Sequence, residues 1–437
     1  MGINDMNNGF QIRFEWLPRD YGDALERATF ADLGIHVDGE VATKVEDLMA
    51  KTVRSTIRAS AYTLGFWFAA NWWRLRWEPE AKSASWKVSH KVGAAGGGYV
   101  WPDLALSTDG SNVLAHCRPT NGEAEPVRFL SNFDVVLPVH AFERGVDEFV
   151  EAVIARLENQ GYQDTDLTAM WGEVREERAD PALTSWRKLE AMLDCDPDEA
   201  PGELIEELRR RAEIVGEGAV EEIAAAAKFN ALEQLDALNR EIQSGELMGL
   251  PDYASLHGRI REEIDFWQPP WKQAAQVAQM ARAQWKLDRG PIRNKTLSDL
   301  FSIPERLVSE PAGHDQVPMS AGFRENGADG KVRVFLNRRY PAGLRFAVAR
   351  LAADHLRTGL EDRLLPATDA KTARQKFQRA FAQEFLCPFE DLTEYLKTED
   401  PSDERIEDAA AFFEVSPLLV RTLLVNRGVL DRISLPE

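Results

Sequence analysis

The sequence lacks the features that mark a secreted, membrane-embedded or metal-stapled protein. Its three cysteines, Cys117, Cys195 and Cys387, lie far apart and form no C-x-x-C pair, which argues against both a disulfide framework and a structural zinc site. The opening segment MGINDMNNGFQIRFEW has no basic stretch followed by an apolar one, so we expect no secretion signal. The most apolar stretch, Ala61 to Trp73, is too short to span a bilayer. We therefore expect a cytoplasmic protein with no membrane partner.

Common ligand-binding motifs are also missing. The sequence contains neither the phosphate-binding loop G-x-x-x-x-G-K-[ST] nor the nucleophile elbow G-x-S-x-G. The glycine-rich stretch at 93–98 lacks dinucleotide-binding spacing and predicts a tight turn. Three alternating aspartates imitate the start of a calcium loop, but Glu199 and Ile205 occupy the positions where such a loop needs Gly and Glu. We expect these aspartates to cap a helix instead: Asp194, Asp196 and Asp198.

Positive charge is scarce overall but unevenly distributed. The chain has 72 acidic and 52 basic residues and a formal charge of -20, which argues against a protein that coats nucleic acid. Residues 141–250 hold 27 acidic and 11 basic residues, whereas residues 322–380 hold 6 acidic and 13 basic ones. We expect the acidic segment to lie against, or compete for, a basic face formed by the second segment.

The 437 residues and 44% hydrophobic content predict a globular protein of several domains. We expect an α+β multidomain fold. An N-terminal mixed α/β domain with antiparallel strands and no recognisable family should cover residues 1–159. An acidic helical region should cover 160–292, and a mostly helical domain with a small sheet should cover 293–437.

Alternating patterns predict strands in the N-terminal domain. GFQIRFEWL and ADLGIHVDG alternate as strands do, and Val41 to Ala70 is expected to be mostly helical. In WWRLRWEPE, Trp73, Leu75 and Trp77 would share one face, which predicts a half-buried strand. Seven of the twelve Trp residues lie in the first 101 positions. We interpret them as a core whose neighbouring Arg side chains face water, rather than as a stacking platform for single-stranded nucleic acid.

The region from about 318 to 430 resembles the ImmA/IrrE family of zinc metallopeptidases. The resemblance rests on PMSAGFRENGADGKVRVFLN, LRFAVARLAADHL, ARQKFQRAFAQEFLCP and IEDAAAFFEVSPLLVRTLLVNRG. Family members typically show R-F-x-x-A-H-E-x-x-H on one helix, E-x-x-A-N-x-F-A-x-x-L-L-x-P on the next, and F-x-V-S further on. The resemblance covers the last quarter to third of the chain and implies a zincin-like C-terminal domain.

All four functional positions of that family are changed in this sequence. The two zinc-binding His positions carry Arg350 and Asp354, the general-base Glu position carries Leu351, and the distant Glu falls on Gln375, within about two residues. Arg350 would repel a divalent metal, and Leu351 cannot take a proton from water. Because Arg350 and Asp354 lie four residues apart, we expect them to pair on one helix face, joined by Gln375. The sequence thus predicts a polar cluster in place of the metal, and no cofactor.

Two alternatives remain open. An unusual zinc site would have to use Asp354, His355, Glu384 and Cys387, although adjacent helical residues point in different directions. The segment EDAAAFFEVSPLLVRTLLVNRG also fits a helix-turn-helix, but only Arg421 and Arg427 decorate it.

The leading expectation is a non-catalytic pseudopeptidase that binds a protein partner. The resemblance implies bacterial or phage-related regulation of transcription or defence, in which active relatives cleave helix-turn-helix repressors. The alternatives are a zinc endopeptidase with a non-standard site and a nucleic-acid-binding regulator.

Overall fold

The computed structural model describes residues 9–120, 127–310, 317–325, 330–397 and 401–431. The chain divides into two compact units, one ending at Ile205 and the other beginning at Glu206. Both combine helices with small antiparallel sheets, so the expected α+β multidomain layout is confirmed. The boundaries predicted near 159 and 292 stay predictions, because contacts within one folded chain do not show which segments fold alone.

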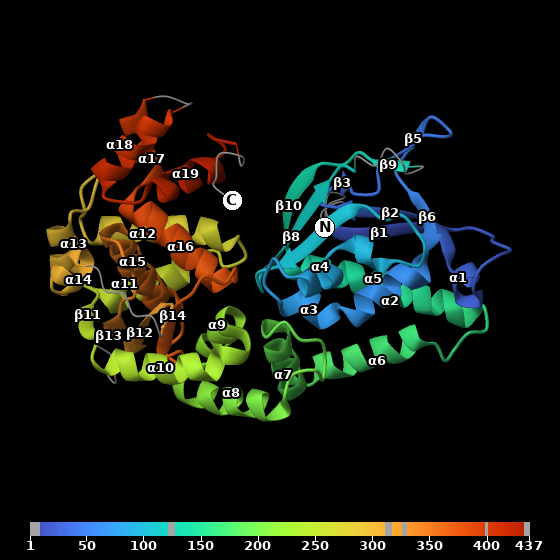
Figure 1. Ribbon diagram of the computed structural model, residues 1–437, viewed down its shortest axis with the longest axis horizontal. Helices are drawn as coiled ribbons and strands as arrows, with labels where there is room; N and C mark the ends of the chain where they lie inside the picture. The colour runs from blue at the N-terminus through green and yellow to red at the C-terminus, as the bar shows by residue number, and fades with distance from the viewer. Residues whose placement is uncertain (1–8, 121–126, 311–316, 326–329, 398–400, 432–437) are drawn as a thin grey trace. The chain divides into compact units, whose positions relative to one another are not determined.

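The described strands of the first unit form three antiparallel sheets (Figure 1). In the first sheet β2 is central and pairs with the other three strands: β1 (Phe10–Trp16), β2 (Phe30–Val37), β3 (Glu40–Val41) and β6 (Ile57–Ser60). The second sheet has the order β10 (Phe133–Pro138), β8 (Asn112–Arg118), β7 (Asp103–Thr108). The third has the order β5 (Thr52–Arg54), β4 (Val45–Asp47), β9 (Val127–Phe129).

Helices pack on the first sheet and enclose an aromatic core. The helices of this unit are α1 (Ala24–Ala28), α2 (Ala61–Ala70), α3 (Trp72–Trp77), α4 (Ala84–His90), η1 (Val92–Ala95), α5 (Val139–Asn159), α6 (Asp166–Ala179) and α7 (Pro181–Met192). Phe142, Phe149, Val153 and Leu157 recur at helical spacing on the buried side of α5, as an amphipathic helix requires. They share one core with alternate residues of β1 and β2, and the two strands predicted here are confirmed.

Two local predictions in this unit are wrong. Residues 41–60 are not helical but form β3 to β6, with β-branched residues in β5 and β6. The segment WWRLRW is the helix α3 rather than a strand. The alternation predicts a strand with one exposed face, but the Arg74 side chain is buried and forms ion pairs with Glu78 and Asp194. Both faces of the segment therefore lie inside the unit. The Trp-rich core itself is confirmed, with Trp72 only 1% exposed.

The second unit is mostly helical around one four-stranded sheet. Its helices are α9 (Glu217–Ala227), η2 (Lys228–Asn230), α10 (Ala231–Gln243), α11 (Tyr253–Glu263), α12 (Pro270–Gln284), α13 (Asn294–Phe301), α14 (Arg306–Ser309), α15 (Pro341–Arg357), α16 (Ala373–Leu386), α17 (Phe389–Leu396), α18 (Asp403–Phe413) and α19 (Pro417–Asn426). Helix α8 (Gly202–Val215) spans the boundary between the units. The sheet has the order β11 (Glu246–Gly249), β13 (Lys331–Phe335), β12 (Ser320–Arg324), β14 (Leu364–Ala367).

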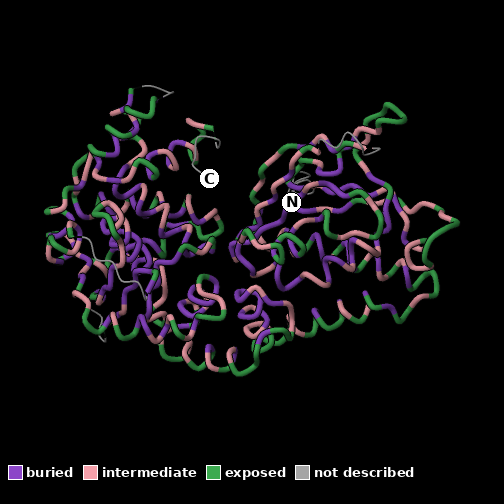
Figure 2. The backbone as a smooth tube through the Cα atoms, viewed as in Figure 1, coloured by how far each residue is buried: buried purple, intermediate pink, exposed green. Residues whose placement is uncertain are grey.

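The core of this unit surrounds α15. Figure 2 shows buried positions along almost the whole of this helix, and twelve of its residues are buried. The region 160–292 is helical as expected except for β11, which pairs with β13. The mostly helical C-terminal region with a small sheet is also confirmed.

No helix among the described residues is both long and apolar enough to cross a membrane.

Candidate functional site

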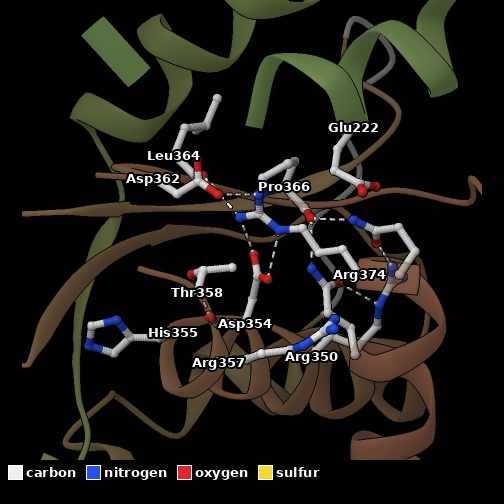
Figure 3. A network of polar contacts seen from close by, with 12 residues as sticks. Glu222, Arg350, Asp354, His355, Arg357, Thr358, Asp362, Leu364, Pro366 and Arg374 are labelled. Carbon is white, nitrogen blue, oxygen red and sulfur yellow. Dashed lines mark hydrogen bonds and ion pairs between the residues drawn. The ribbon is translucent and has the colours of Figure 1, made fainter. Parts of the chain in front are cut away.

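Two neighbouring helices of the second unit carry the positions that the resemblance selects. Pro341 lies in the first turn of α15, where its missing N–H costs no hydrogen bond. Thr372 caps α16 by accepting a hydrogen bond from the Gln375 N–H. Buried charged side chains lie between the helices, among them Arg350, Asp354 and Arg374 (Figure 3). Gln375 and Gln378 of α16 are buried as well.

Arg350 is held by main-chain and amide oxygens. Its Nη2 donates to Thr368 O and to Gln375 Oε1, each at 2.5 Å, and its Nε donates to Gln378 Oε1 at 3.3 Å. Burial, reinforced by the positive charge of Arg379, lowers the pKa of Arg350 to about 9, so the guanidinium is still charged at neutral pH. The expected contact between Arg350 and Gln375 is therefore present.

Asp354 pairs with a different arginine. Its two oxygens accept hydrogen bonds from Nε and Nη2 of Arg374, both at 2.8 Å, and Nη1 of Arg374 donates to Asp362 at 2.8 Å. Burial alone would lower the pKa of Arg374, but the two carboxylates raise it above its usual range. The predicted Arg350–Asp354 pair is wrong. The guanidinium of Arg374 binds Asp354 in a bidentate geometry, while Arg350 donates to Thr368 O and Gln375 Oε1 instead.

The same side chains cover the outer edge of β14. Leu364 and Pro366 of this edge strand, and Thr368 directly after it, follow one alternation, so their main-chain groups turn away from β12. Thr368 O accepts from Arg350, and Leu364 O accepts from Nη2 of Arg374 at 3.3 Å.

Two glutamines of α16 complete this coverage. Pro366 O accepts from Nε2 of Gln375 at 2.9 Å and from Nε2 of Gln378 at 3.0 Å. The Thr368 N–H donates to Gln375 Oε1 at 3.0 Å. Four main-chain groups on the outer edge of β14 are thus bonded by arginine and glutamine side chains. A peptide that adds to a sheet edge needs those groups free.

One acidic residue of the middle region enters the cluster from α9. Glu222 is 5% exposed and accepts a hydrogen bond from Thr372 Oγ1 at 2.8 Å. Burial raises its pKa to about 6, although Arg374 opposes the rise. Helix α9 approaches closely because Gly218 has no side chain: a Cβ there would lie 2.7 Å from Asp362 Oδ2. The acidic segment therefore meets basic side chains as expected, at least through Glu222.

The expected basic face is partly wrong, because much of the positive charge is internal. Among the basic residues of 322–380, the buried ones are Arg324, Arg345, Arg350 and Arg374. Arg324, for example, donates to the carbonyls of Asp362 and Thr358. A guanidinium with several donors can satisfy loop carbonyls that have no backbone partner. The charge pattern in the sequence cannot separate this use from a solvated surface.

The family's zinc positions do not fit a metal in this chain. Arg350 places a cation at the first ligand position, and both oxygens of Asp354 are bonded to Arg374. The Gln375 oxygen accepts from Arg350 and Thr368, and its nitrogen donates to Pro366. Leu351 packs in the core with no exposed surface.

The alternative metal ligands do not gather either. In Figure 3 the His355 ring points away from Arg350; its Nδ1 accepts from Arg324 at 3.0 Å, and burial lowers its pKa to about 3. Glu384 accepts from Gln279 and Arg427, and Cys387 is fully buried with its pKa raised by burial. Within the described part of the chain, no three His, Cys, Asp or Glu side chains are placed to hold a metal ion.

The helix-turn-helix-like segment forms α18 and α19. Glu414 takes a left-handed conformation at the turn, and Ser416 caps α19. Both arginines of this segment have acidic partners: Arg421 donates to Asp403 at 2.8 Å and Arg427 to Glu384 at 3.3 Å.

A second buried cluster, in the first unit, has no counterpart in the sequence patterns. Arg74 donates through Nε to Glu78 at 2.7 Å and through Nη2 to Asp194 at 2.5 Å. It also donates to Asp196 at 3.2 Å. Burial raises the pKa of Glu78 to about 8, and Asp194 adds to the rise while Arg74 opposes it. Its members lie up to 122 residues apart in the sequence, so local spacing gives no signal for it.

This cluster corrects the capping prediction for the three aspartates. Asp194 and Asp196 bind Arg74, and Asp198 accepts from Arg187 at 2.8 Å. Each of these aspartates pairs with an arginine because the loop between α7 and α8 packs on the buried guanidinium groups of Arg74 and Arg187.

Comparisons with protein-family models, with curated proteins and with solved structures give no match to this chain.

Proposed function

We propose that the chain is a non-catalytic binding and regulatory protein, in which a metallopeptidase-like centre has become a structural cluster. The proposal combines the motif resemblance of residues 318–430 with the contacts of α15 and α16. The proposal is supported by the contacts at the positions that the resemblance assigns to a zinc ion. Arg350 donates to Gln375, Gln375 donates to Pro366 O of β14, and the Asp354 carboxylate is bonded to Arg374.

The observation that carries the proposal is the closed edge of β14. Catalysis on a peptide needs both an activated water and a way to align the chain being cut. Here Leu351 stands at the position of the base and Arg350 at that of a ligand. Gln375 and Gln378 both donate hydrogen bonds to the carbonyl of Pro366. A peptide could pair with β14 only by displacing these buried bonds.

Partner binding is therefore proposed for other surfaces of the chain. The partner class implied by the resemblance is a protein, with a helix-turn-helix regulator as the first one to test. The nucleic-acid alternative gains no support from α19, because Arg421 and Arg427 are paired with carboxylates. Only arginines released from those pairs would contribute phosphate contacts.

Metal content of the purified full chain tests the proposal directly. We expect sub-stoichiometric zinc after purification without chelators, no rise in the melting temperature on adding zinc, and no cleavage of a co-expressed regulator. A structural or catalytic zinc would stabilise the fold by mass action. About one zinc per chain, lost together with stability on chelation, would refute the proposal. Affinity purification of the tagged chain with mass spectrometry then identifies the bound partner.

A further inference from the structure

A small pocket opens on the first sheet of the first unit. It has a volume of about 210 Å³ and is lined by Gly9, Gln11, Arg13, His36, Gly39 and Val41. These residues come from β1, β2 and β3 and the turns at their ends. Three of them carry hydrogen-bond donors, and none of the described lining residues is acidic.

Strand register brings the polar residues together. Gln11 lies opposite His36, and Arg13 lies opposite Gly34, so Arg13 is the diagonal neighbour of His36. Gly34 leaves the floor open: a Cβ there would lie 3.1 Å from His36 Nε2. The imidazole of His36 therefore lies over Gly34, in space that a side chain at position 34 would fill. This places the ring on the same face of the sheet as Arg13.

Among the described lining residues, Arg13 is the one that is charged at pH 7, so the lining carries a positive charge. Burial and the nearby charge of Arg13 lower the pKa of His36, so the ring is neutral at pH 7 and gains a second donor when it is protonated. Nη2 of Arg13 donates to Gln11 Oε1 at 3.1 Å, which fixes the guanidinium beside the amide. The guanidinium, the amide nitrogen and the imidazole around this volume match the oxygens of a tetrahedral anion.

We propose that this pocket binds a tetrahedral oxyanion, such as the phosphate group of a monoester, through Arg13, His36 and Gln11. The pocket lies in the first unit and the inference is independent of the function proposed above. Two strands supply the three donors, so the geometry is fixed by the sheet rather than by a loop. The glycines at the rim leave room for the group that carries the anion.

Sulfate is the sharpest probe, because its charge does not change over the relevant pH range. We expect sulfate to shift the His36 ring resonance in NMR spectra of the full chain, with the signal assigned by His36→Gln. Binding should be about fivefold tighter near pH 5.5 than near pH 8, since a bound anion favours the protonated ring. Inorganic phosphate should compete with sulfate, and acetate should bind more weakly.

Matched variants separate a built site from general surface attraction. Arg13→Gln should abolish the sulfate-induced shift, and Gly34→Ala should weaken it by displacing the ring. Arg58→Gln, on the same sheet and paired with Asp32, should leave it unchanged. Equal losses in Arg13→Gln and Arg58→Gln, no shift of His36, or acetate binding as tight as sulfate would each overturn the proposal.

Discussion

The two buried arginine clusters differ in the balance between cations and carboxylates. In the first unit a single arginine, Arg74, meets three carboxylates, those of Glu78, Asp194 and Asp196. In the second unit Arg374 meets Asp354 and Asp362. Arg350 lies nearby with two glutamines and a carbonyl as partners.

This balance helps to determine which carboxyl groups of each cluster are protonated near neutral pH. With carboxylates in excess, burial in the first unit raises the pKa of Glu78 to about 8, so this carboxyl is mostly protonated at pH 7. In the second unit two arginines, Arg350 and Arg374, lie with three carboxylates, those of Asp354, Asp362 and Glu222, and Arg350 is bonded to amide and main-chain oxygens, which do not titrate. The first cluster should therefore respond to pH over a wider window than the second, which should respond chiefly to loss of a partner.

The largest effect is expected when the second cluster loses a carboxylate. Asp354→Asn leaves Arg374 and Arg350 buried with less negative charge nearby, so we expect the free energy of unfolding to fall by about 3–5 kcal/mol. Urea denaturation would measure it. The matched control is Asp403→Asn, whose partner is the surface Arg421 and whose loss should stay below about 1 kcal/mol. If the two variants lost similar free energies of unfolding, the buried Arg374–Asp354 pair would contribute no more to stability than the Arg421–Asp403 pair.

Removing the arginine of the first cluster should cost less. In Arg74→Met we expect a loss of about 2–3 kcal/mol at pH 7, because Glu78 is already neutral and only the aspartates lose a counter-charge. The loss should grow towards about pH 9, where Glu78 ionises. Arg175→Met, which removes an exposed arginine 3.7 Å from Glu151, is the control. A loss that does not change with pH would contradict the proton placement.

The two clusters should also differ in how the free energy of unfolding depends on pH. The pKa of Glu78 is about 8 in the fold against an ordinary 4.5, so between these values the folded state keeps a proton that the unfolded state has released. Stability therefore falls as pH rises through this window. Glu78→Gln mimics the protonated carboxyl, so we expect its stability to equal that of the natural chain below about pH 4.5 and to exceed it by an amount that grows as the pH rises towards 8.

The counterpart in the second unit should show a narrower window. The pKa of Glu222 is about 6, so the gain in Glu222→Gln should grow only between about pH 4.5 and pH 6 and stay constant above that. Thermal melts of both variants across this range give the two profiles. Profiles of the same shape would mean that the two clusters hold their protons alike.

Sequence reasoning reached the second cluster and missed the first for a physical reason. Arg350 and Gln375 lie on consecutive helices, so a motif of known spacing placed them together, and their contact is present. The partner of Asp354 is Arg374, one residue before Gln375, at a position that the motif does not mark. In the first unit the cluster depends on a loop packing on α3 more than a hundred residues away, which no periodicity encodes. There the alternation of WWRLRW predicted a strand because hydropathy treats a buried, ion-paired arginine as a surface residue.

The smallest expected effect tests whether α16 closes the edge of β14 group by group. Gln378→Leu removes one of two donors to Pro366 O, where Gln375 still donates, and the acceptor of the long bond from Arg350 Nε, so we expect a loss of about 1–2 kcal/mol. Hydrogen exchange at the Thr368 amide should stay slow, because its acceptor is Gln375 rather than Gln378. In Gln375→Leu the same amide loses its acceptor and should exchange faster than in Gln378→Leu. If both variants exposed Thr368 equally, α16 would cover the edge as a packed surface rather than through individual hydrogen bonds. The contrast with the proton-holding cluster of Arg74 would then rest on packing instead of on polar chemistry.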